Sequence, residues 1–196
     1  SLHDALPIFS EYVAMPLERI YDGKGVPPKT LALIEPFCIS YHGVSRANIK
    51  PGDRVLDLGC GSGILAIAAL CLGAGQAVGV DIDPKAVDVA YENAALNGIG
   101  RDRCRFLAGN VIADQGLVQE LAREKAQVVL ANIVADVIIP LAPVVPQLLD
   151  REGTFLCSGI IDTRGDEVAA ALEQAGLLVT TRREKNGWIA LEARVR

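Results

Sequence analysis

The chain of 196 residues is 51% hydrophobic and 22% charged, which is typical of one globular domain with a full core plus a short appendage. Its net charge of −5 argues against tight binding to a nucleic-acid backbone, so we expect no direct nucleic-acid contact. The five cysteines lack metal-ligand spacing and no apolar run could span a membrane, which favours a reducing, cytoplasmic location with no metal site and no membrane contact.

Residues 1–50 are irregular, and we interpret them as an N-terminal segment, a remnant linker or lid whose first residues resemble a translated sequencing adapter. Residues 51–196 alternate regularly and form the second predicted domain. The predicted strands are Val55–Leu58, Ala77–Val80, Arg105–Leu107, Val128–Ala131, Thr154–Ser158, Leu177–Arg183 and Trp188–Val195. The predicted helices are Ile64–Leu72, Pro84–Leu96, Gly116–Arg123, Asp136–Leu149 and Asp166–Gln174.

Strands separated by helices indicate right-handed crossovers and a mostly parallel sheet with helices on both faces. The last connection is different, because the tight turn at Asn186-Gly187 can join only antiparallel neighbours. The sequence therefore predicts a doubly wound α/β fold, a mostly parallel seven-stranded sheet that ends in an antiparallel hairpin. This layout is typical of class I, Rossmann-like S-adenosylmethionine-dependent methyltransferases.

A glycine loop follows the first strand, with Gly59, Gly61 and Gly63 at alternate positions after Asp57. The dinucleotide fingerprint is G-x-G-x-x-G, and its helix start holds a pyrophosphate. The Asp57 carboxylate would disfavour a pyrophosphate and suit an ammonium group, while the dense glycines let the chain pass close to a flat nucleoside. S-adenosylmethionine has a nucleoside, a sulfonium and an amino-acid tail without phosphate, so it fits this loop. A glycine turn without a ligand and a NAD-dependent oxidoreductase stay as alternatives.

Three further residues are candidates for cofactor contacts. Asp81 ends the second strand, where a carboxylate can accept hydrogen bonds from both ribose hydroxyls. Its alternative role as a helix cap is already filled by Asp83, which precedes Pro84. Ile82 would then lie against the adenine face, or be ordinary core. Asn110, after the third strand, offers an amide for the adenine edge, or closes a plain turn.

Asn132 ends the fourth strand, in the stretch ANIVAD. Ligands of such sheets bind beyond the carboxyl ends of strands near the switch in strand order. Asn132 therefore points to the place where the transferred methyl group would sit, and its amide oxygen can accept a hydrogen bond from an attacking amine. We predict Asn132 as the catalytic residue and a cofactor contact; an N-cap of the next helix is the alternative.

Together these pieces resemble the PrmA family, the lysine methyltransferases of ribosomal protein L11, from about Gly52 to Val195. The resemblance rests on DLGCGSGILAIAAL, GVDIDPKAV, ENAALNG, ANIVAD, SGI and GWIALEARV. It implies cofactor roles for Gly59, Asp81 and Asn132. The family also has an upstream G-T-G-x-H-P-T-T motif, which implies a cofactor contact for Thr30, although this sequence has Pro27 and Lys29 at the histidine and the first threonine.

The resemblance implies an S-adenosylmethionine-dependent N-methyltransferase of protein lysines with ribosomal protein L11 as partner, and residues 51–196 as its catalytic domain. Family members also carry an N-terminal recognition domain for which this chain has no room. It was cut away, or the chain is a divergent relative with another target. The alternatives are a class I methyltransferase acting on a small molecule or another protein, and a cofactor-binding fragment without activity.

Overall fold

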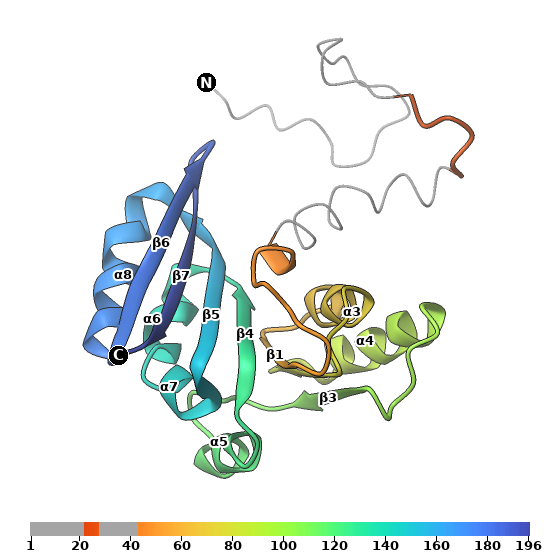
Figure 1. The fold of residues 1–196 in the computed structure, drawn as a ribbon, viewed down its shortest axis with the longest axis horizontal. Helices are drawn as coiled ribbons and strands as arrows, with labels where there is room; N and C mark the ends of the chain where they lie inside the picture. The colour runs from red at the N-terminus through yellow and green to blue at the C-terminus, as the bar shows by residue number, and fades with distance from the viewer. Residues whose placement is uncertain (1–21, 28–42) are drawn as a thin grey trace. The chain divides into compact units, whose positions relative to one another are not determined.

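The computed structural model describes residues 22–27 and 43–196, so the predicted cofactor contact of Thr30 lies outside the described residues (Figure 1). The chain divides into two compact units, Ser1–Glu35 and Pro36–Arg196. In the first unit, residues 22–27 contain a turn in which the amide of Val26 donates to the carbonyl of Gly23. All that follows concerns the second unit.

Seven strands of the second unit form one sheet in the order β3-β2-β1-β4-β5-β7-β6. The strands are β1 (Arg54–Leu58), β2 (Gln76–Asp81), β3 (Cys104–Ala108), β4 (Ala126–Asn132), β5 (Leu149–Ile161), β6 (Leu177–Lys185) and β7 (Trp188–Val195). The first five strands pair in parallel, and β7 lies antiparallel between β5 and β6. The turn between β6 and β7 has positive φ at both Asn186 and Gly187. The predicted sheet and closing hairpin are confirmed.

Six α-helices cover the two faces of this sheet. They are α3 (Ile64–Cys71), α4 (Pro84–Leu96), α5 (Gln115–Ala122), α6 (Ala135–Leu141), α7 (Val145–Leu148) and α8 (Gly165–Gln174), with a 3₁₀ turn, η2, at Asp162–Arg164. Helices α3 and α4 pack on one face against β1, β2 and β3, and α6, α7 and α8 pack on the other against β4 to β7 (Figure 1). Each face has its own apolar core. Val44 and Ala47, from the segment assigned to the N-terminal region, are buried in the core on the α3 face.

The predicted single helix Asp136–Leu149 is wrong, because the chain forms two shorter helices there, α6 and α7. Pro140 is tolerated inside α6, but Pro143 follows it directly and has no backbone N–H to continue the helical bonds. The chain then passes through a turn, with Val144 bonded to the carbonyl of Leu141, before α7 begins at Val145.

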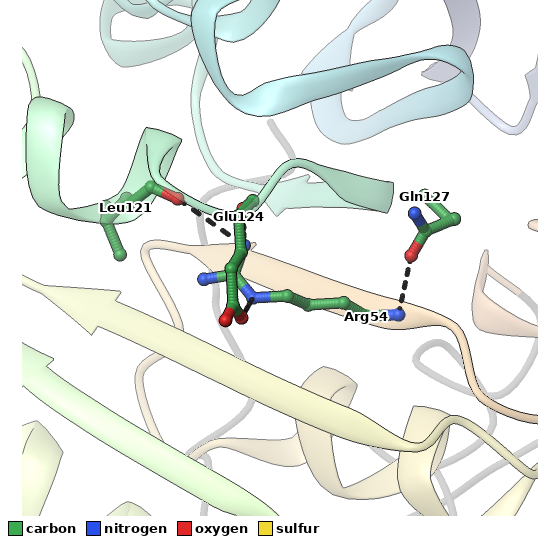
Figure 2. A network of polar contacts seen from close by, with 4 residues as sticks. All are labelled: Arg54, Leu121, Glu124 and Gln127. Carbon is green, nitrogen blue, oxygen red and sulfur yellow. Dashed lines mark hydrogen bonds and ion pairs between the residues drawn. The ribbon is translucent and has the colours of Figure 1, made fainter.

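Figure 2 shows how Arg54 fastens the amino end of β1 to the segment that leads from α5 into β4. Its backbone amide donates to Oε1 of Gln127 at 2.9 Å. Its guanidinium donates to the carbonyls of Leu121 and Glu124 and lies 3.7 Å from the Glu124 carboxylate. These contacts fix β1 beside β4 at the edge of the sheet opposite the candidate site, so the carboxyl ends of the two strands meet in a defined register.

Candidate functional site

Two hollows lie at the carboxyl ends of the strands around β1. In the sheet, β1 has β2 on one side and β4 on the other, so the chain reverses its direction of winding there. Such a switch point leaves a crevice between the loops. The smaller hollow has a volume of about 230 Å³ and the larger about 610 Å³, and Ile133 lines both. We call them the 230 Å³ hollow and the 610 Å³ hollow.

The glycine loop between β1 and α3 borders the 230 Å³ hollow at Gly59. The amides of Gly59 and Cys60 both donate to the carbonyl of Val80, at 2.8 and 3.1 Å, which holds the loop against the end of β2. Gly59 has φ +77°, and a Cβ there would lie only 2.7 Å from Cγ2 of Ile133. The loop can therefore approach β4 this closely only with glycine at position 59.

Gly63 and Gly61 differ in what surrounds them. Gly63 is the N-cap of α3, with φ +77°, and a Cβ there would lie 2.9 Å from Ala90 and 3.0 Å from the ring of Phe106. It therefore serves the packing of α3 against α4 and β3. Gly61 faces open space, and its amide donates to Oδ2 of Asp81 at 2.8 Å. Of the two, Gly61 has the room to contact a ligand, and a ligand contact of Gly63 stays a prediction.

Asp57 lies beneath the loop and is completely buried. Its Oδ2 accepts a hydrogen bond from the amide of Ala66 in α3 at 3.1 Å, whereas its Oδ1 has no protein partner. Burial, offset in part by this hydrogen bond and reinforced by the nearby charge of Asp81, raises the pKa of Asp57 to about 7. The carboxylate thus anchors the start of α3. A direct contact with a ligand ammonium stays a prediction.

Asp81 and Ile82 form the far wall of the 230 Å³ hollow. Oδ2 of Asp81 accepts from Gly61 and Oδ1 accepts from the amide of Asp83 at 3.0 Å. An ionised carboxylate offers about four lone-pair positions, so both oxygens keep capacity for further donors. Ile82 is 74% exposed although it is a large apolar residue, and it borders the hollow. Asp83 caps α4 through the amide of Lys85, as predicted.

Asn110 lies on the loop after β3, at the rim of the same hollow. Its Oδ1 accepts a hydrogen bond from the amide of Ile112 at 3.0 Å, which closes a local turn. The preceding Gly109 donates its amide to the carbonyl of Asp81 at 2.8 Å and so keeps this loop beside β2. The turn role therefore accounts for the side-chain oxygen, and contact of the Asn110 amide with a ligand stays a prediction.

Asn132 is the last residue of β4, is exposed, and lines the 610 Å³ hollow next to Ile133. Its Oδ1 accepts a hydrogen bond from the hydroxyl of Ser158 in β5 at 3.3 Å. The residue that caps α6 is Val134, and it makes no side-chain cap bond, so the alternative role of Asn132 as N-cap is not observed. The side chain is free to face the hollow.

The sequence did not single out the residues that form most of the 610 Å³ hollow. They come from the turn before β1, from β4, from β5 and from the β6–β7 hairpin: Gly43, Arg46, Leu156, Ser158, Gly159, Arg183, Trp188, Ala190 and Glu192. Trp188 is 56% exposed, and Nε of Arg183 lies 3.8 Å from the Glu192 carboxylate. The available signal was the alternation in β7, since Trp188, Ala190 and Glu192 share one face of the strand.

Two further searches of the described residues gave negative results. Over residues 22–27 and 43–196, no group of three or more histidine, cysteine, aspartate or glutamate side chains could hold a metal ion. In the same part of the chain, no helix has both the length and the apolarity that a membrane crossing requires.

Comparison with known families gives one match that covers most of the chain. The profile of the ribosomal protein L11 methyltransferase (PrmA) family matches residues 37–196. A ribosomal protein L11 methyltransferase of Agathobacter rectalis is 44% identical over 144 residues, which cover 74% of this chain and 45% of the relative. The corresponding protein of Pelotomaculum thermopropionicum is 45% identical over 148 residues, which cover 76% of this chain and 46% of the relative. The chain therefore spans about half the length of these relatives.

Solved structures agree with the fold. A ribosomal protein L11 methylase from Lactobacillus delbrueckii subsp. bulgaricus superposes with a TM-score of 0.70 at 32% identity, covering 81% of this chain and 77% of that one. A glycopeptide N-methyltransferase, MtfA, solved with S-adenosyl-L-methionine, superposes with a TM-score of 0.63 at 15% identity, covering 82% of this chain and 94% of that one. The second likeness concerns the fold alone, which is that of class I methyltransferases.

Proposed function

Because the chain belongs to the ribosomal protein L11 methyltransferase (PrmA) family, we propose that it transfers methyl groups from S-adenosylmethionine to amino groups of ribosomal protein L11. One observation carries this proposal: the two hollows meet at Ile133, with Asn132 beside the junction. A nucleoside in one hollow and an amine in the other would bring donor and acceptor together there.

The 230 Å³ hollow fits the adenosine part of the cofactor. Its lining is mostly apolar, with Ile82 and Ile112 available to the adenine faces and Asp81 to the ribose hydroxyls. The positive φ of Gly59 and the open space beside Gly61 leave backbone amides accessible to the amino-acid tail. A phosphate would lie close to the carboxylates of Asp81 and Asp57, which disfavours a dinucleotide.

The cofactor supplies an electrophilic methyl group on a sulfonium. In the displacement, the amine lone pair forms the new N–C bond while the electrons of the S–C bond stay on sulfur, and the ammonium product loses a proton to water. The protein mainly has to align the two partners, which can lower the barrier by roughly 7–11 kcal/mol. Asn132 Oδ1 would orient the amine by accepting one N–H.

The amine must be neutral to react. Deprotonating a lysine with a pKa near 10.4 at pH 7 costs roughly 4.6 kcal/mol. Desolvation in the hollow and the positive sulfonium would both lower the amine pKa, so no dedicated base is required. We propose lysine side chains as the acceptors, because a long apolar stem suits a hollow bordered by Leu156, Trp188 and Val134. A ribosomal protein as partner also favours a cytoplasmic location.

A transfer assay tests the proposal. The chain is incubated with S-adenosylmethionine labelled in the methyl group and with purified ribosomal protein L11, and the label is located by mass spectrometry. We expect label on lysine for the wild type and its loss in Asn132→Ala, with cofactor affinity retained. Label on small amines but not on L11 would instead support the small-molecule alternative. Cofactor binding with no transfer to any amine would support the fragment without activity.

A further inference from the structure

Asn132 is held by the neighbouring strand as well as by its own. On the basis of the proposed function, we propose that Ser158 and Gly159 form a seat that fixes the orientation of the Asn132 amide. Ser158 is then a positioning residue: its hydroxyl occupies one side of Oδ1 and leaves the other side of the same oxygen for the N–H of the acceptor amine.

The contacts between β4 and β5 place the three residues together. Asn132 and Ser158 are direct Cα partners across the parallel strands. The Ser158 hydroxyl donates to Oδ1 of Asn132 at 3.3 Å, and the Ser158 carbonyl accepts from the amide of Ile133 at 3.1 Å. Ser158 therefore holds both the side chain of Asn132 and the backbone that follows it.

A bulge in β5 gives the seat its shape. Between β5 and β7, Cys157 pairs with Leu191 and Ile160 with Ile189, so β5 contains one residue more than its partner. Bulges next to active sites re-aim side chains in this way. Gly159, in the bulge, has φ +83°, and a Cβ there would lie 2.9 Å from Oδ1 of Asn132 and 3.0 Å from the Ile133 carbonyl. Glycine at this position lets β5 approach the amide of Asn132.

The chemistry of the amide explains why its orientation matters. An amide oxygen has two lone pairs, whereas the amide nitrogen only donates. With the Ser158 hydroxyl on one lone pair, the second remains for an amine that lies in the 610 Å³ hollow, which Asn132, Ser158 and Gly159 all line. If the amide rotated by 180°, its NH₂ group would face the amine N–H, and two donors cannot bond to each other.

Sinefungin, the cofactor analogue with an amine at the position of the transferred methyl, probes this seat without any acceptor. S-adenosylhomocysteine has the same nucleoside and amino-acid tail but no such amine. Calorimetry measures the ratio of the two dissociation constants. We expect the wild type to prefer sinefungin by at least tenfold, because hydrogen bonds that involve a charged group are strong. A loss of loop structure would weaken both ligands and leave the ratio unchanged.

Variants assign the preference to the seat. We expect Ser158→Ala to reduce the ratio below about threefold and Asn132→Ala to reduce it to about one, with the double variant no lower than Asn132→Ala alone. Ser158→Thr, which keeps the hydroxyl, should keep the preference, and Ser158→Cys, a weak donor of similar size, should lower it. Thr180→Val is the matched control, since it removes a hydroxyl with a 3.3 Å bond to a backbone carbonyl in the β6–β7 hairpin.

The outcomes separate the two proposals. If the wild type binds neither ligand, the proposed function fails. If it binds both and Ser158→Ala keeps the wild-type ratio, the function stands and the seat is overturned. If circular dichroism shows that Ser158→Ala does not fold, the Thr and Cys variants decide: a higher ratio for Thr supports the seat, and equal ratios overturn it.

Discussion

The 230 Å³ hollow and the 610 Å³ hollow share Ile133 but are built in different ways. The first is made by short consecutive stretches, the glycine loop, the end of β2 and the loop after β3. Their contacts are backbone amides bonded to carbonyls and to Asp81. The second is made by residues as distant as Gly43 and Glu192, and its charged groups are side chains in contact with solvent. A ligand common to a whole fold class suits a backbone cradle, while a variable acceptor suits exchangeable side chains.

The largest expected effect concerns Asp57, the only buried charged residue in the described part of the chain. Its pKa is raised from 3.8 to about 7, so between these values the folded chain holds a proton that the unfolded chain has lost. Stability contributed by Asp57 is therefore fully present below pH 3.8 and declines as the pH rises through 7. We expect the difference in unfolding free energy between the wild type and Asp57→Asn to fall by up to about 4 kcal/mol across this window.

Urea denaturation at pH 4.5 and pH 7.5 measures this difference. Asn keeps an oxygen for the amide of Ala66 but does not titrate, so the comparison with the wild type removes the contribution of other groups. A difference that is the same at both pH values would show that Asp57 is not buried in this way. Exposed Asp88→Asn, on α4, is the control and should show no such trend.

The next effect separates the two hollows directly. Asp81→Ala removes the acceptor of the Gly61 amide and the proposed acceptor of the ribose hydroxyls. Because each hydrogen bond to a charged group contributes about 1.5–3 kcal/mol, we expect cofactor affinity to fall by about 100-fold or more. Calorimetric titration with S-adenosylhomocysteine measures it, with Asp88→Ala as the control. Unchanged affinity would move the cofactor away from this hollow.

Gly59→Ala tests the shared wall. A Cβ at φ +77° and 2.7 Å from Ile133 must displace the loop or the end of β4. We expect cofactor affinity to fall by about tenfold, since the strain is about 1–3 kcal/mol. Gly98→Ala has a similar φ of +68° and no neighbour within 4 Å, so it isolates the cost of the backbone conformation. Gly59→Ala combined with Ile133→Ala should recover part of the affinity; no recovery would place the strain elsewhere.

The smallest effect is expected at the acceptor side. Trp188 is 56% exposed at the rim of the 610 Å³ hollow, so its removal should cost little stability. We expect Trp188→Ala to raise the KM for the acceptor by about three- to tenfold through lost apolar contact, with the cofactor dissociation constant unchanged. Leu178→Ala, at a 49% exposed residue of β6 outside the hollow, is the control. A change in cofactor affinity for Trp188→Ala would mean that the hollows are not separate.

Local patterns were enough to predict most of the fold. The cap at Asp83, Pro84 at the helix start and the Asn186-Gly187 turn each act within a few residues, and the structure has all of them where expected. The helix at Asp136–Leu149 failed, because its apolar spacing continues past Pro143 although the backbone bonds cannot.

The two hollows differ in the same respect. The residues around Gly59 and Asp81 carry local signals, since the turn and the strand end are visible in the sequence. Ser158, Gly159 and Glu192 become neighbours of Asn132 or of its hollow only through strand order and a bulge in β5. Neither is encoded in a short stretch, so no spacing rule could select these residues beforehand.

The central claim, that the cofactor binds in the 230 Å³ hollow beside an empty acceptor side, is tested most directly by nuclear magnetic resonance. Amide chemical shifts of the ¹⁵N-labelled chain are followed while S-adenosylhomocysteine is added. We predict the largest changes at Gly59, Gly61, Ile82 and Asn110, with small changes from Arg183 to Trp188. The largest changes in the β6–β7 hairpin, with the glycine loop unaffected, would contradict this account.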